Sequence, residues 1–594
     1  MKLAPVDLLL IFAFFGVLLT IGFRASRKAG SSSTQFFLSG RAMPWWLLGI
    51  SMVATTFSAD TPNLVTNIVR QQGVYGNWVW WAFLLTGMLT VFVYAKLWRR
   101  SGVMTDLEFY ELRYSGKTAA FLRGFRAIYL GVFFNIVVIA SVCLAAIKIS
   151  GVLLDLSPVT TLLISAFIIV FYTALGGLRG VLLTDLVQFA IAMVGAVWAA
   201  KVVLGLPQVG GLQGLLTHEN VRDRLSLFPD FSNIEMMIPV FLIPIAVQWW
   251  SVWYPGAEPG GGGYVVQRML SAKSERHAVG ATLLFNVAHY ALRPWPWILV
   301  ALCSLIVFPD LDSLQTAFPN LDPSRVKDDL AYSAMLIHLP QGLLGLVVAS
   351  LMAAFMSTVA SHLNWGASYV VNDFYKRFIT PEASERRLVY IGRLATVLLM
   401  VAAGSLALLL ESALQAFHVL LQIGAGTGLL FILRWFWWRI NPISEMVAMI
   451  VSFSVALYFV VHHHLGLPRI SDSVQLCSGV AITTLAWVAA TLLTKPSDSA
   501  TLRSFYRLVK PGGPGWRRVI TEAREDDDPI DDGEGWDLPQ GLLCMFLGCL
   551  TVYSFLFAMG YWIYGNHVPA TILTVVAILG TTSLMKAWAS LRTH

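Results

Sequence analysis

Charged side chains are scarce in this sequence. Asp, Glu, Lys and Arg make up 13% of its 594 residues, whereas 57% of the residues are hydrophobic. This balance excludes an ordinary soluble domain and indicates a polytopic membrane protein, because each bilayer span needs about 20 apolar residues. In a membrane protein, the positive charges behind the net charge of +7 indicate which loops face the cytoplasm. We therefore expect membrane lipid, and no nucleic acid, as a partner.

Cysteine is also rare, and the spacings typical of metal centres are missing. The five cysteines lie in apolar stretches without a Cys-x-x-Cys pair: Cys143, Cys303, Cys477, Cys544 and Cys549. They have the character of small core residues, so neither a disulfide framework nor a metal centre follows. A cleavable signal is not evident either, because Arg24, Arg27 and Lys28 follow the first apolar run rather than precede it.

Apolar runs long enough to cross a bilayer recur along the chain. We expect spans at 5–24, 44–70, 77–98, 123–149, 158–176, 180–205, 234–258, 275–308, 340–371, 386–411, 412–436, 442–464, 474–495, 538–563 and 567–587. Basic residues gather in alternate loops, such as those around Arg24, Arg268 and Arg387, whereas loops 206–233 and 309–332 have few. The positive-inside rule therefore predicts a multi-pass protein of the cell membrane with its N-terminus outside and its C-terminus cytoplasmic.

Hydropathy divides the chain into seven parts. An N-terminal helix and loop (1–43) precede two blocks of five spans, 44–205 and 234–436, separated by an extracellular loop at 206–233. Two further spans (437–495), a cytoplasmic polar linker (496–537) and a C-terminal hairpin (538–594) follow. Because five is odd, the two blocks would face opposite ways across the membrane, which is the inverted-repeat arrangement of many transporters.

One predicted span is interrupted in its middle. Residues Trp45 to Ile68 are apolar at both ends, but Pro62 lacks a backbone donor and clashes with the preceding turn. The carbonyls near Ala54 and Phe57 then lose their helical partners, which membrane proteins tolerate only around a buried site or a watery cavity. A plain Pro-kinked helix is the alternative. Asp60 argues against it, because an intramembrane carboxylate is costly and by default functional.

A second interruption opens the other block. Two prolines and five glycines between Pro255 and Gly263 cannot continue an α-helix. In the alternative interpretation these residues form an extramembrane loop just beyond a shorter helix, and Glu258 is then either a site residue or an ordinary solvated residue. Interrupted helices of this kind hold a cation and a solute near the midplane of many secondary transporters.

Hydroxyl groups cluster on the predicted span 340–371. Ser357 and Ser361 share a helix face with Ala354, and Thr358 lies beside them. Such hydroxyls commonly join helices or bond to a carbonyl one turn earlier, which is the alternative interpretation. Placed against the first interruption, two hydroxyls and three carbonyls would form a five-oxygen cage for a small hard cation.

The polar linker 496–537 starts with basic and aromatic residues and ends in an acidic run. Its first half would suit the anionic inner leaflet of a membrane. Its second half has the composition of a solvated linker. A regulatory role is a further alternative for this segment.

Four stretches resemble the sodium/solute symporter family: the segment from Phe36 to Pro62, GGLRGVLLTDLVQF (Gly176–Phe189), VVQRMLSAKS (Val265–Ser274) and AAFMSTVASHLN (Ala353–Asn364). The resemblance runs from about residue 5 to 440. It implies an all-α, LeuT-like fold with a 5+5 inverted-repeat core, one extra N-terminal helix and about four extra C-terminal helices. It also implies Na⁺ as the coupling ion and alternating-access transport of a small organic solute, such as a sugar or an amino acid.

The resemblance further implies two sets of ion-binding positions. The main sodium site would use carbonyls and hydroxyls of Ala54, Phe57, Ala354, Ser357 and Thr358. A second sodium site, found in some members, would use Asp185 and Ser361, although Ala360 stands where those members have another serine. Asp185 has two alternative roles, as a proton acceptor or as the partner of a nearby arginine.

The solute pocket is implied in the same way, at Thr61, Trp80, Phe83, Pro255, Glu258, Pro259, His289 and Gly424. Sugar-carrying members tend to have amide, carboxylate and lysine side chains at several of these positions, so a sugar specificity does not transfer. Trp80 and His289 favour a solute with an apolar face. Glu258 would favour an amine, and His289 is alternatively a packing residue.

Several classes of function remain open on this basis. A sodium-driven symporter is the main expectation, and a proton-coupled symporter of the same fold is an alternative. A transporter-like receptor would need an output module, and none is recognisable after residue 496. A membrane enzyme would need a converging nucleophile, base and oxyanion donors, so we expect no enzymatic activity. The sequence sets no oligomeric state.

Overall fold

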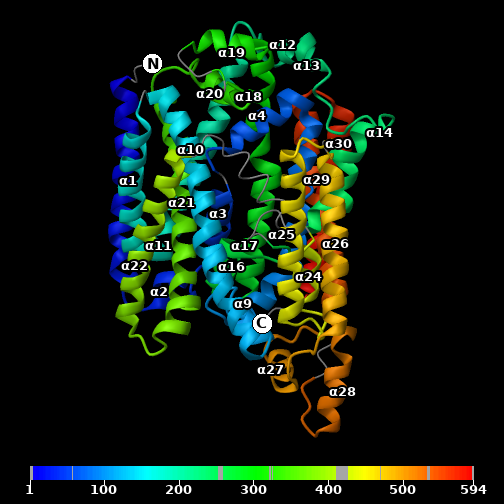
Figure 1. Ribbon diagram of the computed structural model, residues 1–594. Helices are drawn as coiled ribbons and strands as arrows, with labels where there is room; N and C mark the ends of the chain where they lie inside the picture. The colour runs from blue at the N-terminus through cyan, green and yellow to red at the C-terminus, as the bar shows by residue number, and fades with distance from the viewer. Residues whose placement is uncertain are drawn as a thin grey trace.

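Helices account for most of the described structure (Figure 1). The computed structural model describes residues 4–56, 58–154, 156–251, 258–319, 323, 326–409, 426–468, 470–531 and 536–591. Within these ranges the β-type backbone pairing is limited to one isolated bridge between Met43 and Ala272. The chain begins at the upper end of the molecule in Figure 1 and ends toward the lower end, where α27 and α28 project.

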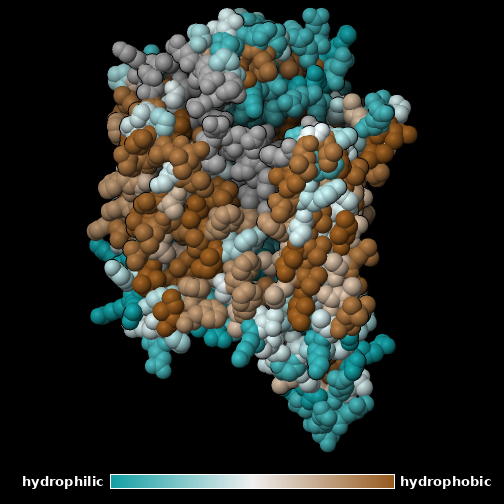
Figure 2. All heavy atoms as spheres, in the orientation of Figure 1, coloured by the Kyte–Doolittle hydropathy of each residue, from teal (hydrophilic) through white to brown (hydrophobic). Residues whose placement is uncertain are grey.

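The described residues include eleven helices that are long and apolar enough to cross a membrane. They are Pro5–Ala29, Val74–Ser101, Gly116–Gly151, Pro158–Leu204, Glu275–Val307, Leu343–Ile379, Glu385–Leu409, Pro442–His463, Asp472–Leu493, Leu538–Ile563 and His567–Ala589. Two shorter apolar helices, Trp45–Thr56 and Ile234–Trp250, lie where the interrupted spans are predicted. A hydrophobic belt separates two hydrophilic ends (Figure 2). The protein is therefore a multi-pass membrane protein.

The first half of the chain forms these helices: α1 (Pro5–Ala29), α2 (Ser33–Leu38), η1 (Ser39–Arg41), α3 (Trp45–Thr56), α4 (Thr61–Gln72), η2 (Val74–Asn77), α5 (Trp78–Trp81), α6 (Leu84–Leu89), η3 (Thr90–Tyr94), α7 (Ala95–Ser101), α8 (Phe109–Arg113), α9 (Gly116–Ile128), η4 (Tyr129–Phe134), α10 (Asn135–Leu154), α11 (Pro158–Leu204), α12 (Gly211–Thr217) and α13 (Glu219–Arg222).

The second half continues with α14 (Ile234–Met237), η5 (Ile238–Leu242), α15 (Ile243–Ala246), η6 (Gln248–Trp250), α16 (Gly263–Leu270), α17 (Glu275–Val287), η7 (Ala288–Leu292), α18 (Pro294–Val307), α19 (Leu311–Ala317), α20 (Leu330–Leu336), α21 (Leu343–Ser368), η9 (Tyr369–Ile379), α22 (Glu385–Leu409) and α24 (Gly428–Leu433). After these come α25 (Pro442–His464), α26 (Asp472–Leu493), α27 (Ser499–Val509), η10 (Pro514–Trp516), α28 (Arg517–Glu525), α29 (Leu538–Ile563) and α30 (His567–Ala589).

Helix α11 contains the two spans predicted at 158–176 and 180–205. Its 47 residues would extend about 70 Å as one straight helix, more than twice the thickness of a bilayer core. Gly177 interrupts it with φ 54° and ψ −156°, a conformation that only glycine adopts readily. A Cβ at this position would also lie 2.6 Å from the Phe36 carbonyl oxygen. The turn between the two spans therefore depends on Gly177.

The centre of the fold is α21, which packs against α11, α1, α22 and α10. Every residue from Ala353 to Ser368 is buried. A helix that is buried all round belongs to the core of a large bundle. The upper end of α21 is fixed by the buried Asp7 of α1, whose Oδ1 accepts hydrogen bonds from the backbone N–H groups of Gly342 and Gly345, both 2.7 Å away. Asp7 thus caps a helix in a different part of the chain.

Residues 498–528, which we term the clasp, cover the lower end of the bundle. Phe505 and Trp516 are fully buried, and the Trp516 indole donates a 2.9 Å hydrogen bond to the Trp435 carbonyl. The Arg113 guanidinium lies 4.9 Å from the Trp516 ring. The aromatic side chains of the linker therefore contact protein rather than a lipid leaflet, because Trp435 and Arg113 offer them a complementary surface.

The charges of the clasp are also engaged internally. Arg503 pairs with Asp526 and Asp528, and Arg507 pairs with Asp528, so the basic first half neutralises the acidic second half. At the start of α27, hydrogen bonding from the Thr501 N–H lowers the pKa of Asp498. The interpretation of 496–537 as a leaflet-binding half and a solvated half does not describe this packed arrangement.

Candidate functional site

The first interruption lies where the sequence predicts it. Helix α3 ends at Thr56 and α4 begins at Thr61, with Pro62 in its first turn, where the missing N–H is tolerated. Ala54 and Thr55 are each 2% exposed, so α3 ends inside the bundle. Phe57, which the resemblance assigns to the sodium site, lies outside the described residues.

A helix that ends inside a membrane protein leaves its last four carbonyls in need of partners. Arg293 donates to two of them, with NH1 3.0 Å from the Val53 oxygen and NH2 3.4 Å from the Thr56 oxygen. Thr358 of α21 donates to the Thr55 oxygen at 2.8 Å. Three of these four carbonyls therefore accept hydrogen bonds from side chains.

The fourth carbonyl belongs to Ala54. Among the described residues no hydrogen bond is directed at its oxygen. Ala54 is the described residue of α3 that the resemblance assigns to sodium. Ala354, from the same assignment, is 2% exposed on α21 one turn before Thr358, and its carbonyl oxygen lies 3.2 Å from the Thr358 hydroxyl.

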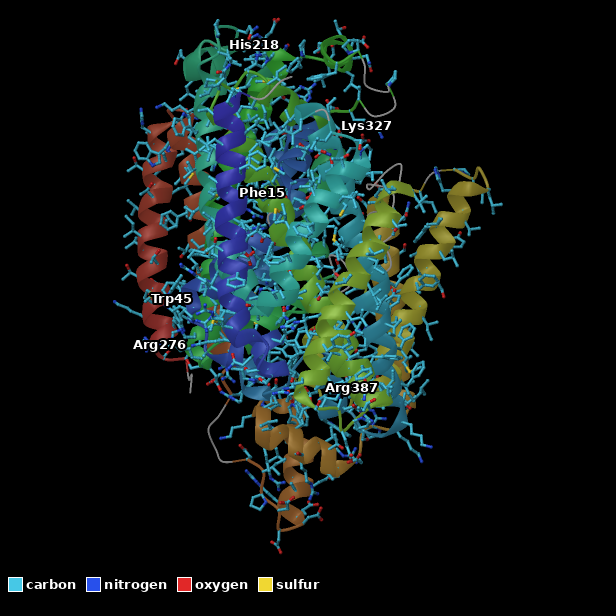
Figure 3. The ribbon with its side chains drawn as sticks, turned by 90° about the vertical axis from the view of Figure 1, so that its left-hand side faces the viewer. Phe15, Trp45, His218, Arg276, Lys327 and Arg387 are labelled. Carbon is cyan, nitrogen blue, oxygen red and sulfur yellow. The ribbon has the colours of Figure 1, made fainter. Side chains whose placement is uncertain are left out.

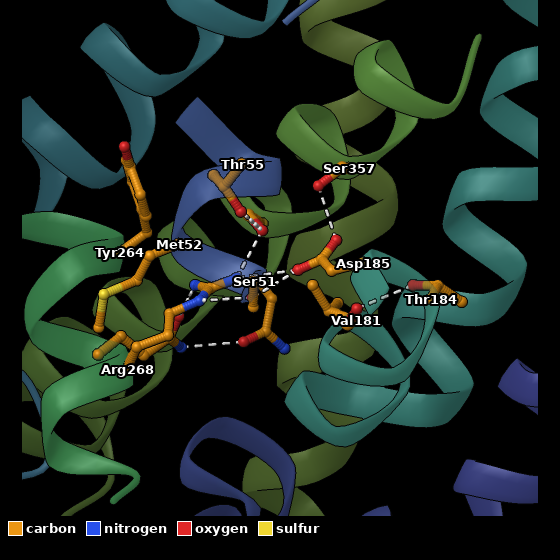
Figure 4. Close-up of polar contacts among 12 residues, drawn as sticks. Ser51, Met52, Thr55, Val181, Thr184, Asp185, Tyr264, Arg268 and Ser357 are labelled. Atoms are coloured by element: carbon orange, nitrogen blue, oxygen red, sulfur yellow. Dashed lines mark hydrogen bonds and ion pairs between the residues drawn. The ribbon is translucent and has the colours of Figure 1, made fainter. Parts of the chain in front are cut away.

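The hydroxyl of Ser357 is oriented by Asp185 of α11. It donates to Oδ1 at 2.6 Å, and the hydroxyl of Ser51 donates to Oδ2 at 2.5 Å (Figure 4). An ionised carboxylate only accepts, so both hydroxyl protons point at Asp185. The lone pairs of Ser357 are thereby left for other contacts. Thr358 likewise directs its proton to a carbonyl, so both α21 hydroxyls present oxygen rather than hydrogen to a neighbouring group.

Asp185 pairs with an arginine, as one of the alternatives for this residue predicts. Arg268 of α16 has NH2 3.8 Å from Asp185 Oδ2, and both side chains are fully buried. The same NH2 donates to the Ser361 hydroxyl at 2.6 Å, and Nε donates to Ser51 at 3.2 Å. Ser361 is also 2.7 Å from the Thr55 hydroxyl. A guanidinium thus bridges Asp185 and Ser361, the two residues implied for a second sodium.

The predicted solute residues divide into two groups. Trp80 and His289 lie together, with ring centroids 5.7 Å apart, and the half-buried Thr61 begins α4 beside the interruption. Phe83 lies between α5 and α6 and is 8% exposed. His289 Nδ1 contacts the guanidinium of Arg293, so this nitrogen accepts and the ring is neutral. Pro255 and Gly424 lie outside the described residues.

Glu258 belongs to a buried polar cluster, and its neighbour Pro259 is also buried. The Glu258 carboxylate is bonded to Arg126 of α9, and both side chains are at least 95% buried. Arg126 NH1 also lies 3.9 Å from Glu445. The interpretation of Glu258 as a solvated loop residue is therefore wrong, and its charge is balanced within the protein.

Sequence reasoning missed the arginines of the site. Arg268 lies in one of the family-like stretches and Arg293 follows an apolar run, but the groups that they bond at the end of α3 and on α21 are more than 80 residues away in sequence. The rule that an intramembrane ionisable residue is functional by default would have selected both. Ser51 carries no local signal, because a single serine in an apolar helix is common.

An interrupted helix whose end meets oriented hydroxyls inside a membrane-spanning bundle is typical of secondary active transporters. The sequence model of the sodium:solute symporter family matches residues 36–452, and the chain belongs to this family. It is accordingly a sodium-coupled symporter of a small solute, with Na⁺ as the coupling ion.

Individual relatives agree with this assignment. The chain is 25% identical to the sodium/glucose cotransporter of Vibrio parahaemolyticus, over 77% of this chain and 85% of that protein. It is 27% identical to the sodium/myo-inositol cotransporter 2 of Oryctolagus cuniculus, over 74% of this chain and 67% of that protein. A solved structure of a Na⁺-coupled sialic acid symporter in a substrate-bound outward-open state is similar in fold, with a TM-score of 0.66 and 19% identity, over 84% of this chain and 100% of that one.

These findings confirm the expectations of an all-α polytopic fold, sodium coupling and a small solute. The family consists of transporters, in agreement with the expectation that the protein is not an enzyme. The division into two inverted five-helix repeats stays a prediction.

Proposed function

We propose that the coupling sodium ion is bound by oxygen atoms of Ala54, Phe57, Ala354, Ser357 and Thr358. The observation that supports this most directly is the hydrogen-bond pattern around α3. Its other three terminal carbonyls accept side-chain donors, whereas none of the described residues donates to Ala54. Carbonyls at the end of a half-helix, together with hydroxyls whose protons are engaged elsewhere, are suited to a cation.

Asp185 supports the same site through Ser357. Its carboxylate fixes the Ser357 hydroxyl and adds negative charge next to the ion without contacting it. Sodium between α3 and α21 would therefore hold these helices together. Because binding free energies are coupled, a solute that also favours this arrangement must tighten sodium binding, and sodium must tighten solute binding equally.

For Asp185 and Ser361 we propose the role of partners of Arg268 rather than ligands of a second sodium. The guanidinium already supplies a positive charge to this pair, so a second ion would have to displace it. One sodium ion gains about 2.3 kcal/mol per 100 mV and about 1.4 kcal/mol per tenfold gradient. Together these support an accumulation of a neutral solute of several hundred-fold, on the order of one decade per 1.4 kcal/mol. Measuring charge per solute in proteoliposomes tests the count, and a value of two would contradict it.

The solute is a small organic molecule with an apolar face, contacted by Thr61, Trp80, Phe83 and His289, with Gly424 completing the pocket. The contact between Trp80 and His289 supports an aromatic wall. Glu258 does not favour an amine here, because an ammonium group would have to displace Arg126. Relatives named for glucose and myo-inositol make sugars and polyols the first class to test.

The experiment is a thermal-shift screen of the purified protein. Sugars, polyols, amino acids, carboxylates and nucleosides are each added with sodium chloride or with choline chloride. A transported solute stabilises the protein more in sodium, because coupled ligands stabilise jointly. A protein whose unfolding temperature responds equally to sodium and choline would contradict the proposed sodium site.

The lower end of the molecule in Figure 1 is the cytoplasmic one in this proposal. Arg276 and Arg387 lie at that end, and His218 and Lys327 lie at the opposite end (Figure 3). Excess arginine and lysine on one side supports a cytoplasmic location of the clasp and an outside N-terminus in the cell membrane. Labelling of single cysteines introduced at Lys327 and Arg387 in intact cells tests this orientation.

A further inference from the structure

We propose that Arg293 is a positioning residue for the sodium site, which turns the end of α3 so that the Ala54 carbonyl is directed at the ion. This inference rests on the sodium site proposed above. It adds a residue from a third helix that contacts neither the ion nor the solute in that proposal.

Arg293 lies at an irregular point of its own span. The π-helix η7 ends at Leu292, and α18 begins at Pro294, so Arg293 occupies the joint between them. Turns of π-helix are frequently found at functional sites. The Arg293 side chain is 1% exposed and reaches the broken end of α3, where NH1 is 3.0 Å from the Val53 oxygen and NH2 is 3.4 Å from the Thr56 oxygen.

The two carbonyls that Arg293 holds lie on either side of Ala54 in the sequence. Val53 directly precedes Ala54, and Thr56 follows it two residues later, at the end of α3. Successive residues of an α-helix are about 100° apart around its axis. A guanidinium that holds Val53 and Thr56 on one side of α3 therefore fixes the direction of the Ala54 carbonyl between them. Thr358 holds the intervening Thr55 carbonyl from α21, which sets that direction toward the α21 hydroxyls.

Arg293 is itself held rigidly. Its NH2 contacts Nδ1 of His289, and its guanidinium carbon lies 5.2 Å from the centre of the Trp297 ring. Both neighbours are on the same span, one turn before and one turn after Arg293. A positioning group is effective only when its own geometry is fixed by a supporting layer, as it is here.

Arginine suits this task better than other residues. Its planar fork can donate to two acceptors at once, whereas lysine is a point donor. Its positive charge is also favourable at the negative end of a helix. Glutamine keeps one donor group but loses the charge and much of the reach. Arg293→Lys therefore removes the fork and keeps the charge, whereas Arg293→Gln removes both the fork and the charge.

The test uses the full-length purified protein and measures its unfolding temperature against the concentration of sodium, lithium or choline chloride. We expect Arg293→Gln to raise the sodium concentration for half-maximal stabilisation at least tenfold and to lower the preference for sodium over lithium. We expect Arg293→Lys to lie between it and the wild type, with at least a threefold increase.

Arg439→Gln is the matched control. Arg439 also donates to two carbonyls at the end of a helix, those of Thr491 at 3.1 Å and Leu492 at 2.7 Å, but in α26. Its replacement should change the unfolding temperature without sodium and leave the sodium midpoint and the sodium-to-lithium ratio as in the wild type. A purely structural role of Arg293 would produce this same result.

The inference is overturned if Arg293→Gln keeps the wild-type midpoint and ion preference, or if it binds sodium more tightly. If Arg293→Gln does not fold, Arg293→Lys decides, and a wild-type midpoint for that variant overturns the inference. Failure of the underlying sodium site looks different. In that case Ser357→Ala and Thr358→Ala would also leave the sodium midpoint unchanged.

Discussion

Replacing Thr358 with alanine removes a hydroxyl oxygen from the proposed sodium site and a hydrogen bond from the end of α3 in one step. Thr358 donates to the Thr55 carbonyl at 2.8 Å and, in our proposal, accepts the ion through a lone pair. Thr358 is 5% exposed, so water replaces neither interaction easily. The substitution should therefore weaken sodium binding and lower the stability of the sodium-free protein, and these two effects can be separated.

The magnitudes follow from the two lost interactions. A hydrogen-bond-like contact with a charged group contributes about 1.5–3 kcal/mol, which corresponds to a sodium midpoint raised by roughly 10- to 150-fold. The neutral bond to Thr55 contributes about 0.5–1.5 kcal/mol, and leaving that carbonyl without a donor adds a penalty of about 1–3 kcal/mol. The second effect lowers the unfolding temperature even in choline chloride.

Two further variants isolate the oxygen atom. Thr358→Val keeps the shape of the side chain without the hydroxyl, and Thr358→Ser keeps the hydroxyl and loses one methyl group, a cost of about 0.8 kcal/mol. Sodium titrations of the unfolding temperature, followed by sodium-driven uptake in proteoliposomes once a solute is known, should group the wild type with Thr358→Ser. Thr358→Ala and Thr358→Val should form the weak-binding group. If the wild type and all three variants share one sodium midpoint, the argument that this hydroxyl binds the ion is refuted.

Three other substitutions test other parts of the structure. Asp185→Asn removes the charge that faces Arg268, and breaking a buried pair costs about 3–5 kcal/mol. Both the unfolding temperature and its response to sodium should therefore fall. A wild-type sodium titration would contradict the role of Asp185 beside the ion. Asp7→Ala removes the cap from two N–H groups of α21 and should cost about 0.5–2 kcal/mol with an unchanged sodium midpoint, whereas a shifted midpoint would show that the cap acts on the site. Trp516→Ala should cost about 3–5 kcal/mol and expose the clasp to limited proteolysis, and unaltered protease resistance would mean that the clasp is held by other contacts.

The sequence was sufficient where a feature depends on neighbouring residues. Pro62 breaks a helix by its own chemistry, so the interruption after Thr56 could be predicted from the local sequence alone. The spacing of Ser357, Thr358 and Ser361 likewise places their hydroxyls together on any α-helix. Local chemistry and the resemblance together therefore predicted the parts of the sodium site that we propose.

Features that depend on distant partners could not be predicted in this way. The charge of Glu258 is balanced by Arg126, which lies 132 residues earlier in the chain, so Glu258 is not an unpaired carboxylate in a solute pocket. The fork of Arg293 finds its carbonyls 237 and 240 residues away. The linker 496–537 has the composition of a surface segment, but its aromatic residues pack because Arg113 and Trp435 form a surface for them, and no local pattern contains that information.

The position of the clasp in the chain has a consequence for biosynthesis. The Trp516 indole covers Trp435, which is made 81 residues earlier. At a synthesis rate of about 5–20 residues per second, the aromatic surface around Trp435 waits on the order of 4–16 s for its cover. During that time the nascent transporter presents to chaperones and proteases an apolar face that the finished protein hides. A chain that ends before Trp516 therefore leaves exposed an aromatic surface that a chain with the clasp covers.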